Sequence, residues 1–165
     1  MEVLIRNIMN QDNADMATII RQNLESYQLD KPGTAYFDPQ LDDLTDYYSN
    51  RDDAAYWIYE LDGQIVGGVG YEIFNAQQKI AEVQKLYVHP SYQRRGIANH
   101  LMAHLMESAT HMDIHALYLE TASILEPATK LYLQLGFELL DAPIENGAAH
   151  TAMDIWMLKK LQTLK

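Results

Sequence analysis

Apolar residues recur along this chain in two periods, one typical of strands and one typical of helices, and the two kinds of segment alternate. Strands are predicted over residues 3–8, 55–61, 65–74, 80–89, 116–121, 137–140 and 153–158. Between the second and third of them, Asp62-Gly63 is a typical hairpin turn. No linker rich in Pro, Gly or Ser interrupts the series, so residues 1–165 are predicted to form a single domain.

Four helices are predicted from apolar residues that lie three or four positions apart. The stripe of the first consists of Met16, Ile20, Leu24 and Tyr27, and that of the third consists of Ile97, Leu101, Leu105, Ala109 and Met112. A short second helix is predicted to start at Asp38-Pro39, because proline fits the first helical turn. The fourth covers residues 125–135 and is predicted to end at Gly136 in the left-handed conformation.

The composition narrows the classes of function. Twelve basic against 23 acidic residues give a formal net charge of −11, which repels a nucleic-acid backbone and favours a cationic partner. There is no cysteine, so disulfides, thiolate metal sites and a cysteine nucleophile are excluded. Neither a signal peptide nor an apolar run of ~20 residues is evident. We therefore expect a cytoplasmic protein that binds neither membranes nor nucleic acid.

The segment Gln93-Arg94-Arg95-Gly96-Ile97-Ala98 joins a predicted strand directly to a predicted helix. Such a junction leaves backbone N–H groups unpaired at the positive end of the helix dipole, where an anion binds favourably. Gly96 and the small Ala98 would let a phosphate approach the backbone, and the arginines add positive charge. On its own, the segment fits an ordinary loop and helix cap equally well. The patterns of a P-loop and of a Rossmann site are absent.

Two blocks of sequence resemble the signatures of the GNAT family, the Gcn5-related N-acetyltransferases. The first runs from Glu82 to Leu101 as Glu-x3-Leu-Tyr-Val-x-Pro-x2-Gln-x2-Gly-x-Ala-x2-Leu, and the second is Ala128-x2-Leu131-Tyr132-x2-Leu135-Gly136-Phe137. The resemblance implies a three-layer α/β fold (α+β mixed), whose central, mostly antiparallel sheet of about seven strands is flanked by about four helices. It also implies that acetyl-CoA binds as cosubstrate, without a metal.

The resemblance also assigns residues to the binding of coenzyme A and to the reaction. The expected coenzyme A contacts are Leu86, Tyr87, Val88, Gln93, Arg94, Arg95, Gly96, Ile97 and Ala98. Glu82 stands where the family often has its general base, with Glu120 as the alternative, and Tyr132 stands where it places the general acid. Each has a structural alternative, since Glu82 could pair with Lys85 and Tyr132 could be a core aromatic. Leu125 departs from the family, because many relatives have a coenzyme A-binding Asn there.

The predicted function is therefore acetyl transfer to a primary amine of a small molecule or an exposed peptide, directly and without an acyl-enzyme. The alternative is a non-catalytic sensor or regulatory module that binds acyl-CoA, although such a module would need neither Glu82 nor Tyr132. A homodimer is one possible assembly. His100 and His104 lie one helical turn apart, but with no cysteine and no partner acid we expect no metal.

Acidic residues crowd the segment around the second predicted helix, which in the family forms one wall of the acceptor site. They are Asp38, Asp42, Asp43, Asp46, Asp52 and Asp53. Two interpretations are open. The acids could attract a cationic acceptor to the site, or they could simply be exposed to water on the outer face of the helix.

Overall fold

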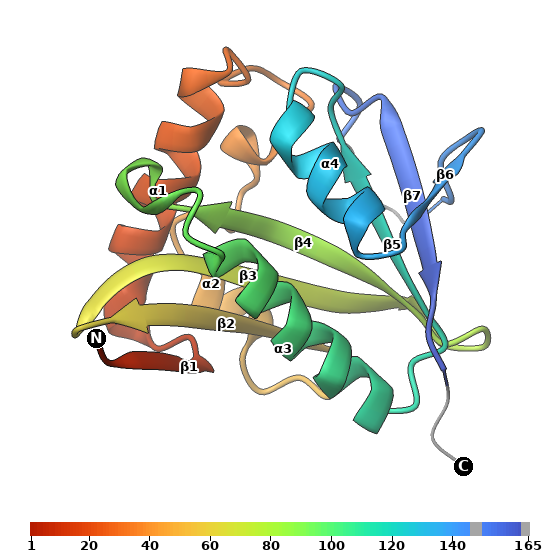
Figure 1. Ribbon diagram of the computed structural model, residues 1–165, viewed down its shortest axis with the longest axis horizontal. Coiled ribbons are helices and arrows are strands. Elements are labelled where there is room, and N and C mark those ends of the chain that lie inside the picture. Colours follow the sequence, from red (N-terminus) through yellow and green to blue (C-terminus); the bar gives the residue numbers. More distant parts are fainter. Residues whose placement is uncertain (146–149, 163–165) are drawn as a thin grey trace.

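The computed structural model describes residues 1–145 and 150–162 and contains one seven-stranded sheet in the order β1-β2-β3-β4-β5-β7-β6 (Figure 1). The strands are β1 (Val3–Asn7), β2 (Ala54–Leu61), β3 (Gln64–Asn75), β4 (Ile80–Val88), β5 (Ala116–Thr121), β6 (Glu138–Leu140) and β7 (Ile155–Lys160). Neighbouring strands are antiparallel except for β4 and β5, which are parallel. The predicted mixed and mostly antiparallel sheet is confirmed.

Helices cover both faces of this sheet. They are α1 (Asn13–Ser26), α2 (Leu44–Tyr48), α3 (Ile97–His111) and α4 (Glu126–Gln134), with short 3-10 segments at Asn10–Asp12, Ala35–Phe37 and Pro90–Tyr92. In Figure 1, α3 and α4 lie in front of the sheet, and α1 and α2 lie behind it. Along β2, Trp57 and Tyr59 belong to the core under α3, whereas Tyr56 and Ile58 belong to the core under α1 and α2. The sheet is therefore buried on both faces, which gives the predicted three layers.

The parallel strands β4 and β5 separate partway along their length. In Figure 1 they lie together at the lower right and diverge from there. Among the described residues, their pairing joins Ile80–Glu82 to Ala116–Tyr118, although β4 continues to Val88 and β5 to Thr121. A bulge follows in β4, where Lys85 adopts a left-handed φ of 51°. The hydroxyl of Tyr56 donates a hydrogen bond to the carbonyl oxygen of Lys85 (2.7 Å) and holds this bulge in place. The sheet thus opens directly after Glu82.

Two predictions about the helices are wrong. The second helix starts at Leu44 and not at Asp38, which adopts an extended conformation, as residues before proline do. The carboxylate of Asp38 binds Lys85 and His150, so it does not cap a helix. Met112 lies at the end of α3 with 40% of its surface exposed, and it accepts a hydrogen bond from Tyr71 and does not extend the core stripe. The other predicted elements are present with small shifts at their ends.

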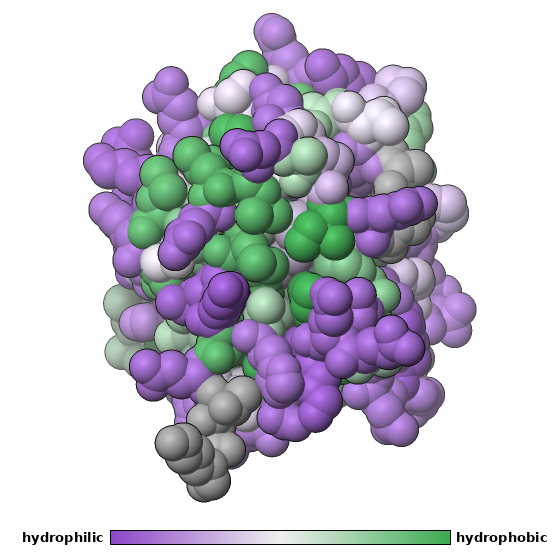
Figure 2. Space-filling model, turned by 90° about the vertical axis from the view of Figure 1, so that its right-hand side faces the viewer, coloured by the Kyte–Doolittle hydropathy of each residue, from purple (hydrophilic) through white to green (hydrophobic). Residues whose placement is uncertain are grey.

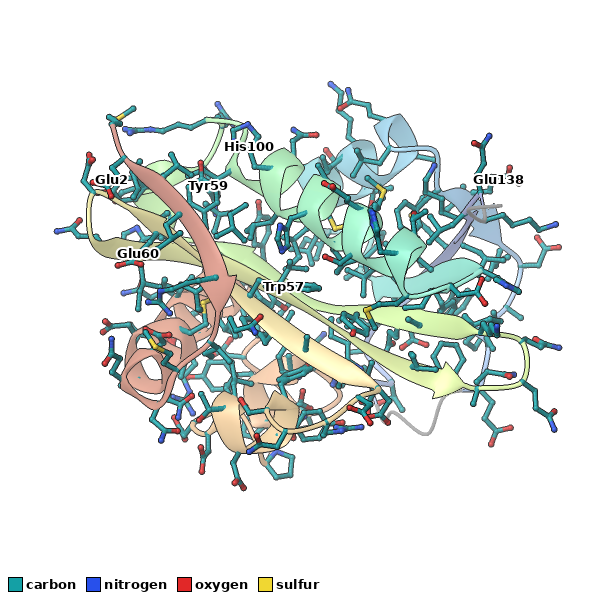
Figure 3. The ribbon with its side chains drawn as sticks, turned by 90° about the horizontal axis from the view of Figure 1, so that it is seen from below. Glu2, Trp57, Tyr59, Glu60, His100 and Glu138 are labelled. Carbon is teal, nitrogen blue, oxygen red and sulfur yellow. The ribbon has the colours of Figure 1, made fainter. Side chains whose placement is uncertain are left out.

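Two of the histidines of α3, His100 and His104, pack the helix against β2. The ring of His100 stacks on Tyr59 with centroids 6.1 Å apart (Figure 3). His104 meets the ring of Trp57 edge-on at 4.9 Å. Figure 3 also shows Glu2 and Glu138 at opposite ends of the sheet, whose edge strands are β1 and β6. Within residues 1–145 and 150–162, no three His, Cys, Asp or Glu side chains gather as metal ligands. Nor does this part of the chain form a helix long and apolar enough to span a membrane.

Apolar residues are also exposed near the β6 edge. Figure 2 shows hydrophobic residues gathered among polar ones on the side of the molecule that faces right in Figure 1. Leu133 of α4 is 49% exposed and Leu139 of β6 is 61% exposed. Surfaces of this kind often bind other proteins. The homodimer nevertheless stays a prediction.

Candidate active site

A cleft of about 750 Å³ lies where β4 and β5 separate. It is lined by parts of α1, β4, β5 and α4, by the loop and first turn of α3, and by His150 and Met153. Eight of the nine predicted coenzyme A contacts line it, namely Leu86, Tyr87, Val88, Gln93, Arg94, Gly96, Ile97 and Ala98. So do the three predicted catalytic residues, Glu82, Glu120 and Tyr132. Arg95 does not line the cleft, and its guanidinium lies over the ring of Tyr92, 5.1 Å from the centroid.

The N-terminus of α3 opens into this cleft. Gly96 is the N-cap with a φ of 80°, and no side chain caps the helix. A Cβ at Gly96 would meet no atom within 4 Å, so the backbone here faces open space. The first N–H groups of a helix have no partner inside the helix, and the positive charges of Arg94 and Lys130 line the same cleft. These residues fit a phosphate group of the kind that coenzyme A carries.

Two side-chain amides hold the loop before α3 against β4. Asn23 of α1 is buried and donates through Nδ2 to the carbonyl oxygen of Val88 (2.9 Å). Gln93 donates through Nε2 to Oδ1 of Asn23 (2.8 Å) and to the same Val88 oxygen (3.1 Å). The predicted contact residue Gln93 therefore has a structural task. Sequence reasoning did not identify Asn23. The pattern that could have indicated it is a polar residue beside the apolar stripe of the first helix.

Glu82 is the last residue of β4 that pairs with β5, and only 6% of its surface is exposed. Its Oε1 accepts a hydrogen bond from Nε2 of Gln84 (2.8 Å). Burial raises the pKa of Glu82 to about 7, and the negative charge of Glu120 acts in the same direction. A carboxyl group that titrates near neutral pH can accept and release a proton under physiological conditions.

Glu120 of β5 lines the same cleft in a different environment. It is half-buried, and its Oε2 accepts a hydrogen bond from the hydroxyl of Tyr118 (2.6 Å). Tyr132 of α4 is 7% exposed, and its ring meets Phe137 edge-on at 5.8 Å. Burial raises the pKa of the Tyr132 hydroxyl well above its usual range, so the phenol keeps its proton at neutral pH. The cleft therefore combines both candidate bases, Glu82 and Glu120, with a protonated phenol.

Residues 20–137 match the family model for the Acetyltransferase (GNAT) family. The chain belongs to this family. It is 37% identical over 161 residues to the uncharacterized N-acetyltransferase YjgM of Escherichia coli (strain K12), an alignment that covers 96% of this chain and 95% of that protein. The resemblance seen in the two sequence blocks is confirmed.

Solved structures of other GNAT proteins share the fold. An acetyltransferase of the GNAT family from Staphylococcus aureus Mu50 superposes with a TM-score of 0.86 and 16% identity, over 98% of this chain and 100% of that one. The PaiA N-acetyltransferase of Thermoplasma acidophilum, solved in complex with coenzyme A, gives a TM-score of 0.73 and 17% identity over 97% and 99% of the two chains. At these identities the likeness shows the fold alone.

An ion-pair cluster adjoins the cleft of this GNAT domain. Nζ of Lys85 lies 2.7 Å from Oδ2 of Asp38, and Nε2 of His150 lies 2.8 Å from Oδ1 of the same carboxylate. The Lys85 side chain is only 4% exposed. Burial acts to raise the pKa of Asp38, but the hydrogen bond from His150 and the charge of Lys85 outweigh it and lower that pKa. Lys85 and His150 both line the cleft, so this cluster fixes part of its wall.

The other acids around the second helix lie outside the cleft. Asp42 pairs with Arg21 (2.7 Å), and Asp53 pairs with Arg51 (2.9 Å). The other three, Asp43, Asp46 and Asp52, are exposed and absent from the cleft lining. Only Asp38 of the six contacts residues that line the cleft. The arrangement favours the interpretation in which most of these acids face water.

Proposed function

We propose that this protein is an acetyl-CoA-dependent N-acetyltransferase that moves the acetyl group directly to a primary amine of a small molecule or an exposed peptide. One observation carries the proposal. The cleft between the separated ends of β4 and β5 is lined by an uncapped helix N-terminus, by the buried carboxyl group of Glu82 and by the buried phenol of Tyr132. An anion site and a proton-transfer pair are what the reaction requires.

Residues of the cleft divide into a binding part and a reacting part. The N–H groups that follow Gly96, with Arg94 and Lys130, would hold the phosphates. Residues 86–88 of β4, which lie beyond the pairing with β5, would bind the arm that leads to the thioester. When bound, acetyl-CoA supplies an activated acetyl thioester. Arg95 would contribute only positive charge, because its side chain does not line the cleft.

Glu82 would act as the general base. Alkylamines are mostly protonated at neutral pH because their pKa is ~10.4, so a proton must leave before the nitrogen can attack. A Glu82 carboxylate with a pKa of about 7 can take this proton, directly or through a water molecule. Tyr132 would hold a proton at its hydroxyl for the departing sulfur. Glu120 is the second candidate base, and its half-exposed position makes it the weaker one.

The alternative function is an acyl-CoA sensor without turnover. A sensor needs the binding part of the cleft but gains nothing from burying a carboxyl group at a cost of several kcal/mol. The burial of Glu82 beside the cleft therefore favours an enzyme.

Release of free thiol from acetyl-CoA in the presence of a panel of amines distinguishes the two functions. We expect release that depends on one class of amine, with the acetylated amine as second product. Tight binding of acetyl-CoA without turnover across amino acids, diamines, polyamines and peptides would instead support the sensor.

Gly96→Glu is expected to abolish the stabilisation that acetyl-CoA gives to the wild-type protein. A ligand at 100 times its Kd stabilises the folded state by about 2.7 kcal/mol, which thermal unfolding detects. The new side chain would project into the open space at the helix N-terminus and would add a negative charge there.

Gly63→Glu is a matched control for this substitution. Gly63 has a φ of 82° and equally open surroundings, but it lies in the hairpin turn between β2 and β3. This variant has the same backbone penalty and the same added charge, yet it should keep the full acetyl-CoA effect. A full effect in Gly96→Glu as well would show that the phosphates bind elsewhere.

A further inference from the structure

Two glutamates face each other across β3 and β4. Glu72 is the register partner of Glu82, and partners in an antiparallel pair project from the same face of the sheet. Gln84 is two residues further along β4 and shares this face. Its Nε2 donates to Oε1 of Glu82 at 2.8 Å and approaches Oε1 of Glu72 at 3.4 Å. A neutral carboxamide thus bridges two carboxyl groups that would otherwise repel each other.

Tyr48 of α2 fixes the orientation of this carboxamide. The Tyr48 hydroxyl donates to Oε1 of Gln84 at 2.5 Å, and the tyrosine is 2% exposed. If the carboxamide turned over, its oxygen would face the Glu82 oxygen, and the Tyr48 hydroxyl would face an N–H donor. The bond from Tyr48 therefore keeps the donor side of Gln84 directed at Glu82.

Neighbouring residues hold Tyr48 in its place. Its ring packs on Tyr56 with centroids 5.3 Å apart, beneath Gly70 of β3. A Cβ at Gly70 would lie 3.3 Å from the Tyr48 ring and 2.6 Å from the Tyr56 ring. Only glycine leaves both rings room at this position, so the sequence of β3 accommodates the tyrosine that orients Gln84.

Charged side chains also lie around the Glu82–Gln84 bridge. Burial tends to raise the pKa of Glu72, but hydrogen bonds from Tyr47 (2.6 Å) and Arg51 (2.6 Å) outweigh it, so Glu72 stays ionised. Further charges that act on Glu82 belong to Lys85 on the same strand, to Glu120 of β5 and to His150. Of the two carboxyl groups that face each other, Glu72 is therefore a fixed anion and Glu82 can titrate.

We propose that Gln84, oriented by Tyr48, is a positioning residue that holds the Glu82 carboxyl group at the cleft and favours its ionised form. This inference rests on the proposed function, in which Glu82 is the base. A hydrogen bond to a charged group is strong enough to move a titration midpoint by one pH unit. Without the bridge, Glu82 should therefore require a higher pH to ionise.

Gln84→Met tests the bridge, because methionine is similar in size but cannot donate. We expect the ionisation midpoint of Glu82 to rise by about one pH unit, which lowers the ionised fraction at pH 7 about five-fold. The rate at pH 7 should fall by a similar factor and recover at higher pH. A loss of rate that is equal at every pH would overturn the proposal.

Adjacent tyrosines offer a matched pair of variants for the orienting step. Tyr48→Phe removes the hydroxyl that binds Gln84, and Tyr47→Phe removes the hydroxyl that binds Glu72. Each deletes one oxygen from one buried or half-buried ring of α2. The midpoint should rise in Tyr48→Phe and stay unchanged in Tyr47→Phe. Equal shifts in the two variants would contradict the assigned role of Tyr48.

Carboxyl ¹³C NMR of glutamate-labelled protein measures the midpoint without turnover, and the resonance of Glu82 is assigned by its loss in Glu82→Gln. A shifted midpoint in Gln84→Met supports the bridge, and an unshifted one overturns it, whether or not an acceptor amine is known. A shifted midpoint with an unchanged pH–rate profile would support the bridge and reject Glu82 as the base. The proposed function and this inference can thus fail separately.

Discussion

Glu82→Gln is expected to lower the rate of acetyl transfer at pH 7 by a factor of about 10² to 10⁴, the usual contribution of a positioned general base. Glutamine has the same shape and keeps an oxygen that can accept from Gln84, so the cleft should retain its form. It cannot accept a proton from the amine. The pH–rate profile of the wild type should rise through about pH 7, where Glu82 ionises, and this rise should be absent in the variant.

Glu120→Gln is the control for this prediction, because Glu120 is the alternative base. It should keep the rise in rate with pH and most of the activity. If the rise disappears in Glu120→Gln and persists in Glu82→Gln, the two carboxyl groups have the opposite roles from those proposed.

Glu82→Gln should also stabilise the protein at high pH. Burial raises the pKa of Glu82 from 4.5 in a free side chain to about 7. Between these values the folded state binds more protons than the unfolded state, so stability falls as the pH rises from about 5 to 7. Above pH 7 the full penalty is about 3 kcal/mol. Because Glu82→Gln lacks this penalty, it should be more stable than the wild type by up to about 3 kcal/mol at pH 8.

Urea unfolding at two pH values measures this effect. The advantage of Glu82→Gln should shrink to about 1 kcal/mol or less at pH 5, where the folded wild type already has a protonated Glu82. A difference that is the same at pH 5 and pH 8 would mean that Glu82 titrates normally. A variant that is less active and yet more stable is the expected signature of a group buried for its chemistry.

Local patterns indicated a possible anion site at the start of α3, and the family resemblance assigned it to coenzyme A. The segment from Gln93 to Ala98 is contiguous, and the free N–H groups at a helix start follow from backbone geometry alone. In the structure this helix start has no side-chain cap, and its residues line the cleft. The reacting part was reached only through resemblance, because Glu82 and Tyr132 belong to separate elements that the fold brings to one cleft.

Contacts between distant segments could not be predicted in this way. Asp38 meets Lys85 and His150 across 47 and 112 positions of sequence, and Tyr48 meets Gln84 across 36. The bulge at Lys85 depends on the register of two strands, which no pattern within β4 reveals. The wrong start of the second helix has the same origin. Asp38-Pro39 is a good local start signal, but the tertiary partners of Asp38 take its carboxylate away.

Tyr132→Phe is expected to reduce kcat by about 10² while leaving the affinity for acetyl-CoA nearly unchanged, because only a proton donor is removed. The phenyl ring can keep its edge-on contact with Phe137, so the fold should tolerate the change. Tyr71→Phe is the control, since Tyr71 is buried in the same core but does not line the cleft. It should have the wild-type kcat.

Measurements of kcat and of the Kd for acetyl-CoA separate the two possible roles of this residue. An acid that acts on the departing sulfur contributes only as the thiolate forms, so its loss should appear in kcat and not in binding. A core aromatic would affect neither quantity when its hydroxyl alone is removed. Full kcat in Tyr132→Phe would therefore assign Tyr132 to packing, and the protonation of the sulfur would then require another donor in the cleft or water.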